Sequence, residues 1–186
     1  MKTYQSVFLL FLILFVACEK SDDTIRIELS TLTNLRGESG LSYLESLQKW
    51  NDLKDSNGKS YVYQTSFTSW AGFGSITEIR VEDGKVTSRK YQAFNYNDMT
   101  GEREVTFSYS ETASKLGSNQ QGTAPWTIDE WYNSCLSKYL VVDDKNNTIY
   151  FETEDNGLMT LCGFVPNNCV DDCFQGISIN AFEWIN

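Results

Sequence analysis

Hydrophobic residues along this chain follow two periods, and each period predicts a different kind of element. One set recurs at helical spacing: Leu44, Leu47 and Trp50. Ser42 and Glu45, at the start of this run, form a capping box whose side chains satisfy free backbone donors. The pattern stops at Asn57-Gly58, because glycine readily ends a helix. The sequence therefore predicts a helix between Ser42 and Asn57.

A second helix is expected after Thr127. Residues 127–130 (Thr-Ile-Asp-Glu) form another capping box, and Trp126 and Trp131 occupy the two positions of a hydrophobic staple. Apolar positions then recur every three or four residues, at Ile128, Trp131, Cys135 and Tyr139. This spacing predicts one buried stripe along the helix.

The other period is two, which is typical of β-strands. Residues 61–67 alternate between the two faces of a strand, and residues 76–81 and 86–94 flank the turn at residues 82–85 (Glu-Asp-Gly-Lys). The Asp-Gly pair of that turn favours the positive φ of a tight hairpin. Further strands are expected around Val105, Phe107 and Tyr109, and at residues 139–142, 148–153, 158–164 and 176–184.

Residues 110–124 are rich in Ser, Gln, Thr and Gly without periodicity, and they predict a mobile surface loop. The expected order is therefore helix, strands, loop, helix, strands. This order favours an α+β fold in which two helices pack on one face of an antiparallel β-sheet. The length fits one such domain at residues 37–186, preceded by a tether at residues 18–36.

The N-terminus indicates where the protein resides. Lys2 is followed by an apolar run of eleven residues at 7–17, which is too short to span a bilayer but is typical of a signal peptide. The run ends in Phe15-Val16-Ala17-Cys18, which resembles the bacterial lipobox although Phe15 replaces the usual leucine. The resemblance implies a lipoprotein signal peptide at residues 1–17 and an acylated N-terminus at Cys18. The alternative is an ordinary secretory signal followed by a chance cysteine.

Residues 19–23 (Glu-Lys-Ser-Asp-Asp) resemble the acidic tether of Bacteroidota surface lipoproteins. This resemblance implies a lipid-anchored protein of the outer membrane, exposed at the cell surface, where several acyl chains hold it stably. Asp23-Thr24-Ile25 resembles the O-glycosylation triplet of that phylum. A solvated linker is the simpler interpretation of the same residues, and the two are compatible.

Four short segments resemble an uncharacterised family of bacterial secreted and lipoprotein domains. They are Trp50, Tyr61-x-Tyr63, residues 81–86 and residues 127–130. These are strand, turn and cap positions, so the resemblance implies a fold rather than an activity. The cysteine-rich tail departs from that family.

Composition removes several classes of function. The chain has no histidine, which excludes Ser-His-Asp and Cys-His catalysis as well as imidazole metal sites. Its net charge of −10 argues against nucleic acid as a partner, because phosphate neutralisation needs a basic face. No phosphate-binding or dinucleotide motif is present, so no cofactor is expected.

Four cysteines remain beside Cys18: Cys135, Cys162, Cys169 and Cys173. An even number in an oxidising compartment predicts two disulfides, for which three pairings are possible. A bond from Cys135 into the segment around residues 163–168 would pin the second helix to the sheet, and the other two cysteines would close that loop. A structural zinc site is the alternative, but the spacing lacks paired zinc knuckles.

Three acidic clusters lie beside predicted turns: Asp143-Asp144, Glu152-x-Glu154-Asp155 and Asp171-Asp172. Paired carboxylates can hydrolyse glycosidic bonds without histidine, but this chemistry needs a cleft. Acidic side chains at turns are ordinarily solvated. A carboxylate-dependent hydrolase is therefore the third of three hypotheses.

The preferred hypothesis depends on aromatic residues at turns. In Trp70-Ala71-Gly72-Phe73-Gly74, glycines flank an apolar turn in a way that burial would not require. Trp70 and Phe73 are thus candidates to stack on a sugar or to anchor a protein; the alternative is that both rings cover the core. We expect a non-enzymatic, lipid-anchored surface domain that binds a macromolecule or glycan. A structural spacer of the cell envelope is the second hypothesis.

Overall fold

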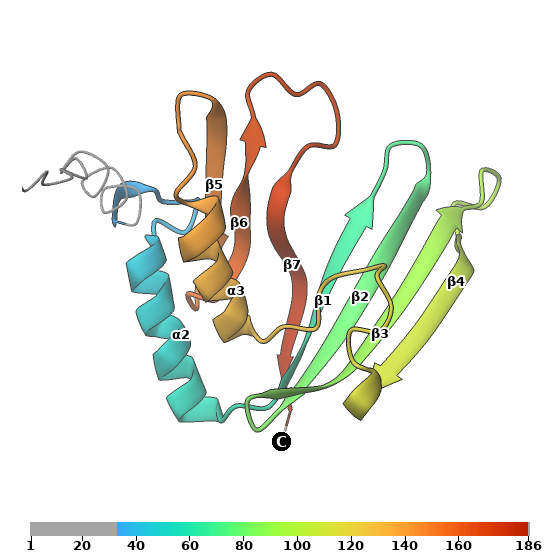
Figure 1. The fold of residues 1–186 in the computed structure, drawn as a ribbon, viewed down its shortest axis with the longest axis horizontal. Coiled ribbons are helices and arrows are strands. Elements are labelled where there is room, and N and C mark those ends of the chain that lie inside the picture. Colours follow the sequence, from blue (N-terminus) through green and yellow to red (C-terminus); the bar gives the residue numbers. More distant parts are fainter. Residues whose placement is uncertain (1–32, 186) are drawn as a thin grey trace, which may run out of the picture.

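A computed structural model describes residues 33–185 (Figure 1). It contains one seven-stranded antiparallel sheet with the strand order β4-β3-β2-β1-β7-β6-β5. The expected α+β class is confirmed, with sheet predominating. The elements in chain order are α2 (Tyr43–Asn57), β1 (Tyr61–Thr68), β2 (Phe73–Glu82), β3 (Lys85–Tyr96), β4 (Arg103–Thr112), a 3-10 turn (Ala113–Lys115), α3 (Ile128–Ser134), a π-helical turn (Cys135–Tyr139), β5 (Asn147–Thr153), β6 (Met159–Pro166) and β7 (Gln175–Trp184).

The expected signal peptide (residues 1–17), Cys18 and most of the tether lie outside the described residues. Within residues 33–185, no helix has the length and apolar character needed to cross a membrane.

Both helix starts form as the sequence predicts. In α2 the Glu45 carboxylate accepts a hydrogen bond from the Ser42 amide at 2.8 Å, and the Ser42 hydroxyl accepts one from the Glu45 amide. Gly58 ends α2 with φ of 87°. At α3 the Trp126 and Trp131 rings of the staple lie 4.7 Å apart. Local sequence is sufficient here because each interaction joins residues at most five positions apart in the chain.

The predicted strand at residues 139–142 is wrong. The chain instead continues α3 into the π-helical turn, which the Leu140 amide closes on the Cys135 carbonyl at 3.0 Å. The helical spacing that runs through Cys135 to Tyr139 therefore prevails over the β-branched Val141 and Val142. Strands β2 and β3 are also longer than predicted. A tight turn at residues 69–72 lets β2 pair with β1 as far as Gly74 opposite Thr68, and β3 pairs with β4 as far as Tyr96 opposite Arg103.

The expected mobile loop at residues 110–124 needs correction. Residues 110–112 belong to β4, and the remainder is attached to the sheet. Arg89 of β3 donates to the Thr123 and Asn119 carbonyls at 3.0 and 2.7 Å, and the Thr123 amide donates to Thr77 at 3.0 Å. The polar composition that suggested a free loop supplies these hydrogen bonds instead.

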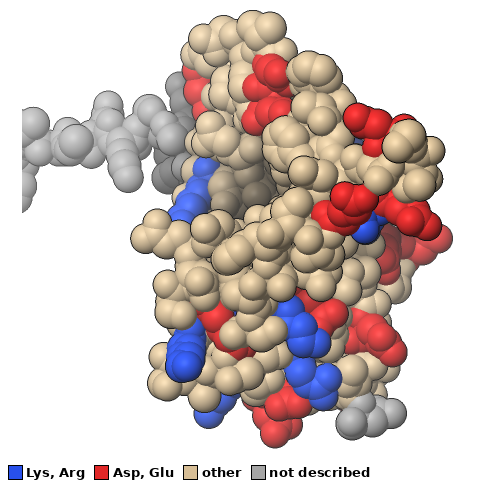
Figure 2. All heavy atoms as spheres, turned by 90° about the vertical axis from the view of Figure 1, so that its right-hand side faces the viewer, with Lys and Arg blue, Asp and Glu red and all other residues tan. Residues whose placement is uncertain are grey.

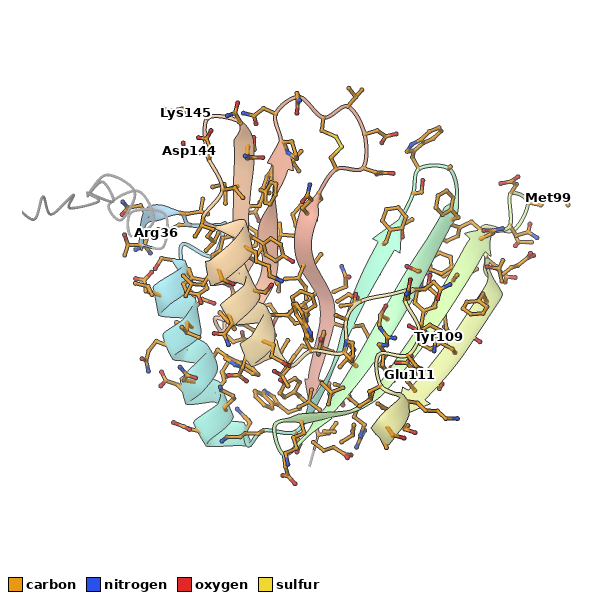
Figure 3. The ribbon with its side chains drawn as sticks, viewed as in Figure 1. Arg36, Met99, Tyr109, Glu111, Asp144 and Lys145 are labelled. Carbon is orange, nitrogen blue, oxygen red and sulfur yellow. A yellow bond between two sulfur atoms is a disulfide. The ribbon has the colours of Figure 1, made fainter. Side chains whose placement is uncertain are left out.

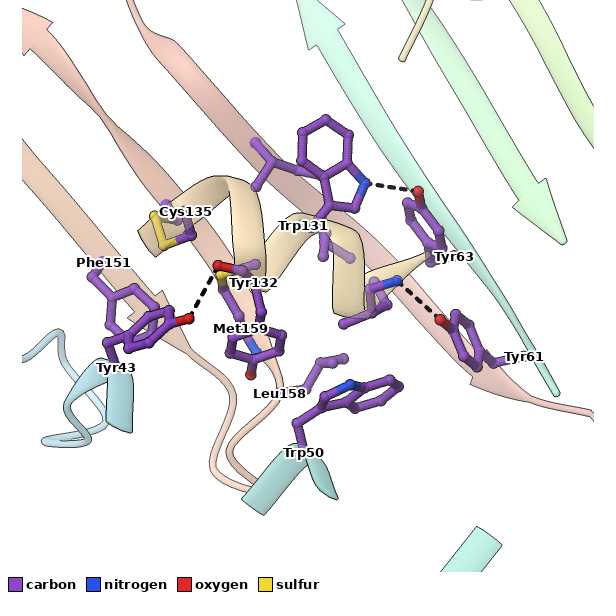
Figure 4. Packing of buried hydrophobic residues seen from close by; sticks show 14 of the residues in the cluster. Tyr43, Trp50, Tyr61, Tyr63, Trp131, Tyr132, Cys135, Phe151, Leu158 and Met159 are labelled. Carbon is purple, nitrogen blue, oxygen red and sulfur yellow. Dashed lines mark hydrogen bonds between the residues drawn. A yellow bond between two sulfur atoms is a disulfide. The ribbon is translucent and has the colours of Figure 1, made fainter. Parts of the chain in front are cut away.

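The core is built on aromatic residues whose polar atoms are paired (Figure 4). The Trp50 ring of α2 lies 5.4 Å from that of Tyr61 and 5.5 Å from that of Trp184. The Tyr61 hydroxyl accepts from the Ile128 amide at 2.9 Å, and the Tyr63 hydroxyl accepts from the Trp131 indole at 2.8 Å. Buried hydroxyls without partners would be costly, so these bonds connect α3 to β1 specifically.

Candidate functional site

Five aromatic side chains gather on one face of β1 to β4. We call Phe67, Phe73, Tyr91, Phe107 and Tyr109 the aromatic patch. The strand register accounts for it, since Thr77 lies opposite Tyr91 and Tyr91 opposite Tyr109. Phe67 of β1 lies opposite Ser75 of β2 in the same way. Directly opposed residues point to the same face of a sheet, so rings from all four strands share this face.

The rings of the patch form two contacting groups; the three phenylalanines are open to solvent, whereas Tyr91 is only 9% exposed. Phe67 and Phe73 lie 6.1 Å apart, and Tyr91 lies 6.3 Å from Phe107 and 5.3 Å from Tyr109. Phe67, Phe73 and Phe107 are exposed by 44, 47 and 48% of their surface. A surface hollow of about 390 Å³ lies between the Phe67–Phe73 pair and Tyr91.

A second hollow, of about 340 Å³, adjoins the patch where β1 and β7 separate. Phe67 also lines this hollow, facing Phe174 and Ile177 from the β7 side. Hydroxyl side chains complete the wall, and the Trp131 ring of α3 reaches it. The first hollow is lined by Phe67, Phe73, Gly74, Ser75, Tyr91, Ala93, Phe94, Asn95 and Thr106. The second hollow is lined by Thr65, Ser66, Phe67, Ser75, Thr77, Gly122, Thr123, Trp131, Phe174, Gly176, Ile177 and Ser178.

None of these lining residues is charged, although the chain carries a net charge of −10. Viewed from the β4 side, acidic side chains gather on the right and at the top, and acidic and basic side chains mix over the lower part of the surface (Figure 2). The aromatic patch is therefore suited to an uncharged ligand surface.

The structure separates the two candidate binding residues of the sequence. Phe73 belongs to the aromatic patch, whereas Trp70 projects from the turn between β1 and β2 with 83% of its surface exposed. The alternative that both rings cover the core is wrong for Trp70. Sequence reasoning missed Phe67, Phe107 and Phe174, because alternation along a strand does not reveal which face stays uncovered.

A buried ion pair between Arg89 and Glu111 lies beside the patch. Glu111 is close to Tyr109, the patch residue on the same strand β4 (Figure 3). The Arg89 guanidinium meets the Glu111 carboxylate at 2.9 Å, with 2 and 1% of the two side chains exposed. The carboxylate also accepts from the amides of Gly117 and Asn119 at 2.7 and 2.6 Å. Burial opposes ionisation of Glu111, but Arg89 and these hydrogen bonds outweigh it and hold its pKa well below the usual range.

The same pair fixes the tyrosine at the edge of the patch. The Arg89 guanidinium lies 5.2 Å from the Tyr109 ring centre, and the Tyr109 hydroxyl donates to the Gln121 carbonyl. Partial burial raises the pKa of Tyr109, so the ring stays neutral at physiological pH. Sequence reasoning also missed this pair, since charged residues on predicted strands are ordinarily solvated.

The four cysteines form two disulfides. Cys135–Cys162 joins the π-helical turn to β6, and Cys169–Cys173 closes the loop between β6 and β7. Of the three possible pairings, this is the one in which Cys135 pins helix to sheet. Paired sulfurs leave no thiolates for the alternative zinc site, and among residues 33–185 no group of acidic, Cys or His side chains is arranged to hold a metal ion.

The acidic cluster around Glu154 and Asp155 lies in a hollow outside the patch. A hollow of about 670 Å³ contains Glu38, Glu154 and Asp155, beside the turn that joins β5 to β6. All three side chains are exposed. Their exposure is what solvation of charged surface residues alone requires.

No protein-family model, curated protein or solved structure matches this chain. The similarity to an uncharacterised lipoprotein family stays a prediction.

Proposed function

We propose that this protein is a lipid-anchored domain on the outer face of the outer membrane, and that it binds a macromolecule or glycan without catalysing a reaction. The observation that carries the proposal is the aromatic patch, in which three phenylalanine rings are each nearly half exposed. Contiguous apolar surface of this kind on a soluble domain usually marks an interaction site.

The patch stays accessible because the two helices cover only one end of the sheet. We infer that both helices pack on one face of the sheet, the face that carries the patch. Tyr61 and Tyr63 contact Trp50 and Trp131 of the helices, and Phe67 follows at the same parity along β1. The helices then stabilise the β1, β7 and β6 end. At the other end residues 119–123 cover Arg89 and Tyr91, and the exposed rings of Phe67, Phe73 and Phe107 remain for a ligand.

Binding is favoured over hydrolysis because uncharged residues line both hollows beside the patch. Carboxylate-dependent hydrolysis needs two acidic side chains flanking the scissile bond, with the pKa of one raised. A spacer role leaves the exposed rings unexplained, since a spacer gains nothing from apolar surface.

Two screens of the purified domain test this proposal: an array of bacterial and host glycans, and a displayed library of random dodecapeptides. Ligands from either screen are then measured against Phe67→Ala and Phe73→Ala. We expect each variant to weaken binding by at least about tenfold, because buried aromatic anchors dominate interface energies.

Leu44→Ala is the matched control, because Leu44 is 43% exposed but lies on α2, outside the patch. It should leave affinity unchanged. The proposal fails if neither screen yields a ligand, or if every ligand binds the Phe67→Ala and Phe73→Ala variants as tightly as the wild type.

A further inference from the structure

The central strand β1 has an incomplete partner on one side. It pairs with β2 along its whole length, as far as Thr68 opposite Gly74. With β7 the pairing shifts between Gln64 and Thr65 and ends at Thr65 opposite Ile179. Within the described residues, the last three residues of β1 therefore have a paired strand on the β2 side alone.

The direction of the free backbone groups follows from one hydrogen bond. The Ser66 amide donates to the Asn180 side chain at 2.6 Å, so the polar backbone edge of Ser66 faces β7 rather than β2. Alternate residues of a strand present their N–H and C=O groups in the same direction. The amide and carbonyl of Thr68 therefore face the same opening.

The opposite wall of the opening is the first part of β7. Gln175 and Ser178 pair with Phe164 and Leu161 of β6, and no register joins residues 175–178 to β1. Figure 1 shows β1 and β7 diverging towards the turn between β1 and β2. Residues of both strands line the 340 Å³ hollow, which we call the wedge.

An aromatic ring and two glycines shape this wall. The Phe174 ring covers Gly163 and Gly176, where an added Cβ would come within 2.5 and 2.8 Å of its Cζ atom. An added Cβ would come still closer to backbone, at 2.4 Å from the Gln175 carbonyl oxygen for Gly163 and at 2.2 Å from the Cys162 carbonyl oxygen for Gly176. The glycines thus let β6, β7 and the Phe174 ring pack closely, and the ring gives the wedge an apolar side.

We propose that the wedge holds an extended peptide segment of a partner protein, which pairs with the free edge of β1. This inference depends on the proposed binding function and names its ligand class. An extended peptide supplies N–H and C=O groups at strand spacing, which complement the Ser66 carbonyl and the Thr68 amide and carbonyl, because the Ser66 amide is already bonded to Asn180. These groups span about 7 Å, two residues at roughly 3.3 Å each.

The chemistry of the wall specifies the side chains of the peptide. All lining residues are uncharged, so a charged side chain facing them would lose hydration without gaining a partner. Residues that point into the wedge are therefore apolar or carry a hydroxyl group, to match Phe67, Phe174 and the surrounding Thr and Ser side chains. Charged residues are confined to the alternate, solvent-facing positions of the peptide.

Selection from the random dodecapeptide library tests the ligand class. Peptides that bind the purified domain should carry uncharged residues at alternate positions. Each peptide is then synthesised in two forms, with N-methyl groups on the amides of one edge or of the other. N-methylation of the edge that faces β1 should weaken binding at least about tenfold, and methylation of the other edge should leave it within about twofold, because only one edge donates to β1.

Two variants locate the binding site. Thr68→Pro removes the amide that faces the wedge and should abolish peptide binding, whereas Thr68→Val keeps the amide and should preserve it. If Thr68→Pro lowers the melting temperature, the pair of N-methylated peptides alone decides the question.

The outcomes separate this inference from the proposed function. A glycan that binds in a Phe67-dependent manner, with no peptide selected, overturns the peptide inference and leaves the proposed function standing. Peptides that tolerate N-methylation on both edges also overturn it. Absence of any ligand that depends on Phe67 or Phe73 overturns both.

Discussion

The buried Arg89–Glu111 pair makes a quantitative prediction about the segment after β4. Glu111→Gln removes the negative charge but keeps the size of the side chain. Arg89 is then left with a full positive charge at 2% exposure and only neutral acceptors, namely the new amide oxygen and the Thr123 and Asn119 carbonyls.

The expected cost is large. Removing one partner of a buried ion pair costs about 3–5 kcal/mol, against a total stability of about 5–15 kcal/mol for a domain. For a domain of about 150 residues this corresponds to a fall in melting temperature of about 6–20 °C. Thermal unfolding followed by circular dichroism measures it directly.

A matched control separates burial from charge. Glu78 pairs with Lys90 at 2.9 Å, but 30 and 61% of the two side chains are exposed. Glu78→Gln should therefore change stability by about 0–1 kcal/mol. Amide hydrogen exchange adds a local measurement, because the Gly117 and Asn119 amides donate to Glu111 and should lose protection in Glu111→Gln alone.

The same pair predicts an acid dependence. Since the folded-state pKa of Glu111 is depressed below its usual 4.5, its contribution is complete above that value and is lost as the pH falls through the folded-state pKa. Wild type should therefore lose stability below about pH 4.5 more steeply than Glu111→Gln. A melting temperature of Glu111→Gln within about 2 °C of wild type at pH 7 would refute the reasoning.

Three further predictions concern the other features. Replacing Cys135 and Cys162 by alanine should lower the free energy of unfolding by about 3.6 kcal/mol, and replacing Cys169 and Cys173 should lower it by only about 2 kcal/mol, because a disulfide that closes a longer loop restricts the unfolded chain more. Equal melting temperatures of the two variants would contradict this. Cys18→Ser should release the protein from the membrane fraction, and mass spectrometry of native protein should find acyl chains on Cys18; an unmodified N-terminus would exclude the lipid anchor. Trp70→Ala should change stability by less than about 0.5 kcal/mol in chemical denaturation, because its ring is 83% exposed, whereas a large loss would place the ring in the core.

Local interactions explain which elements could be predicted. Both capping boxes join residues three apart, the hairpin at residues 82–85 needs only its Asp-Gly pair, and the alternation of residues 61–67 records burial on one side. Each feature is complete within one turn or one strand, so no knowledge of distant neighbours is required.

The strand at residues 139–142 shows where this reasoning fails. Its β-branched residues favour a strand, but a helix already in progress and the Cys135–Cys162 bond to β6 hold the preceding turn in place. Propensity is a weak preference, and a long-range contact overrides it.

The sequence by itself therefore determined the α+β class, both helix starts, most strands and the even set of cysteines. Only the tertiary structure decided that the C-terminal strand β7 lies beside β1, that the pair diverges after Thr65, and that Arg89 and Glu111 meet in the interior. The physical reason is that burial and strand pairing belong to pairs of residues far apart in the chain. The aromatic patch follows from such pairings, since Phe67, Tyr91 and Phe107 become neighbours only when β1 to β4 align.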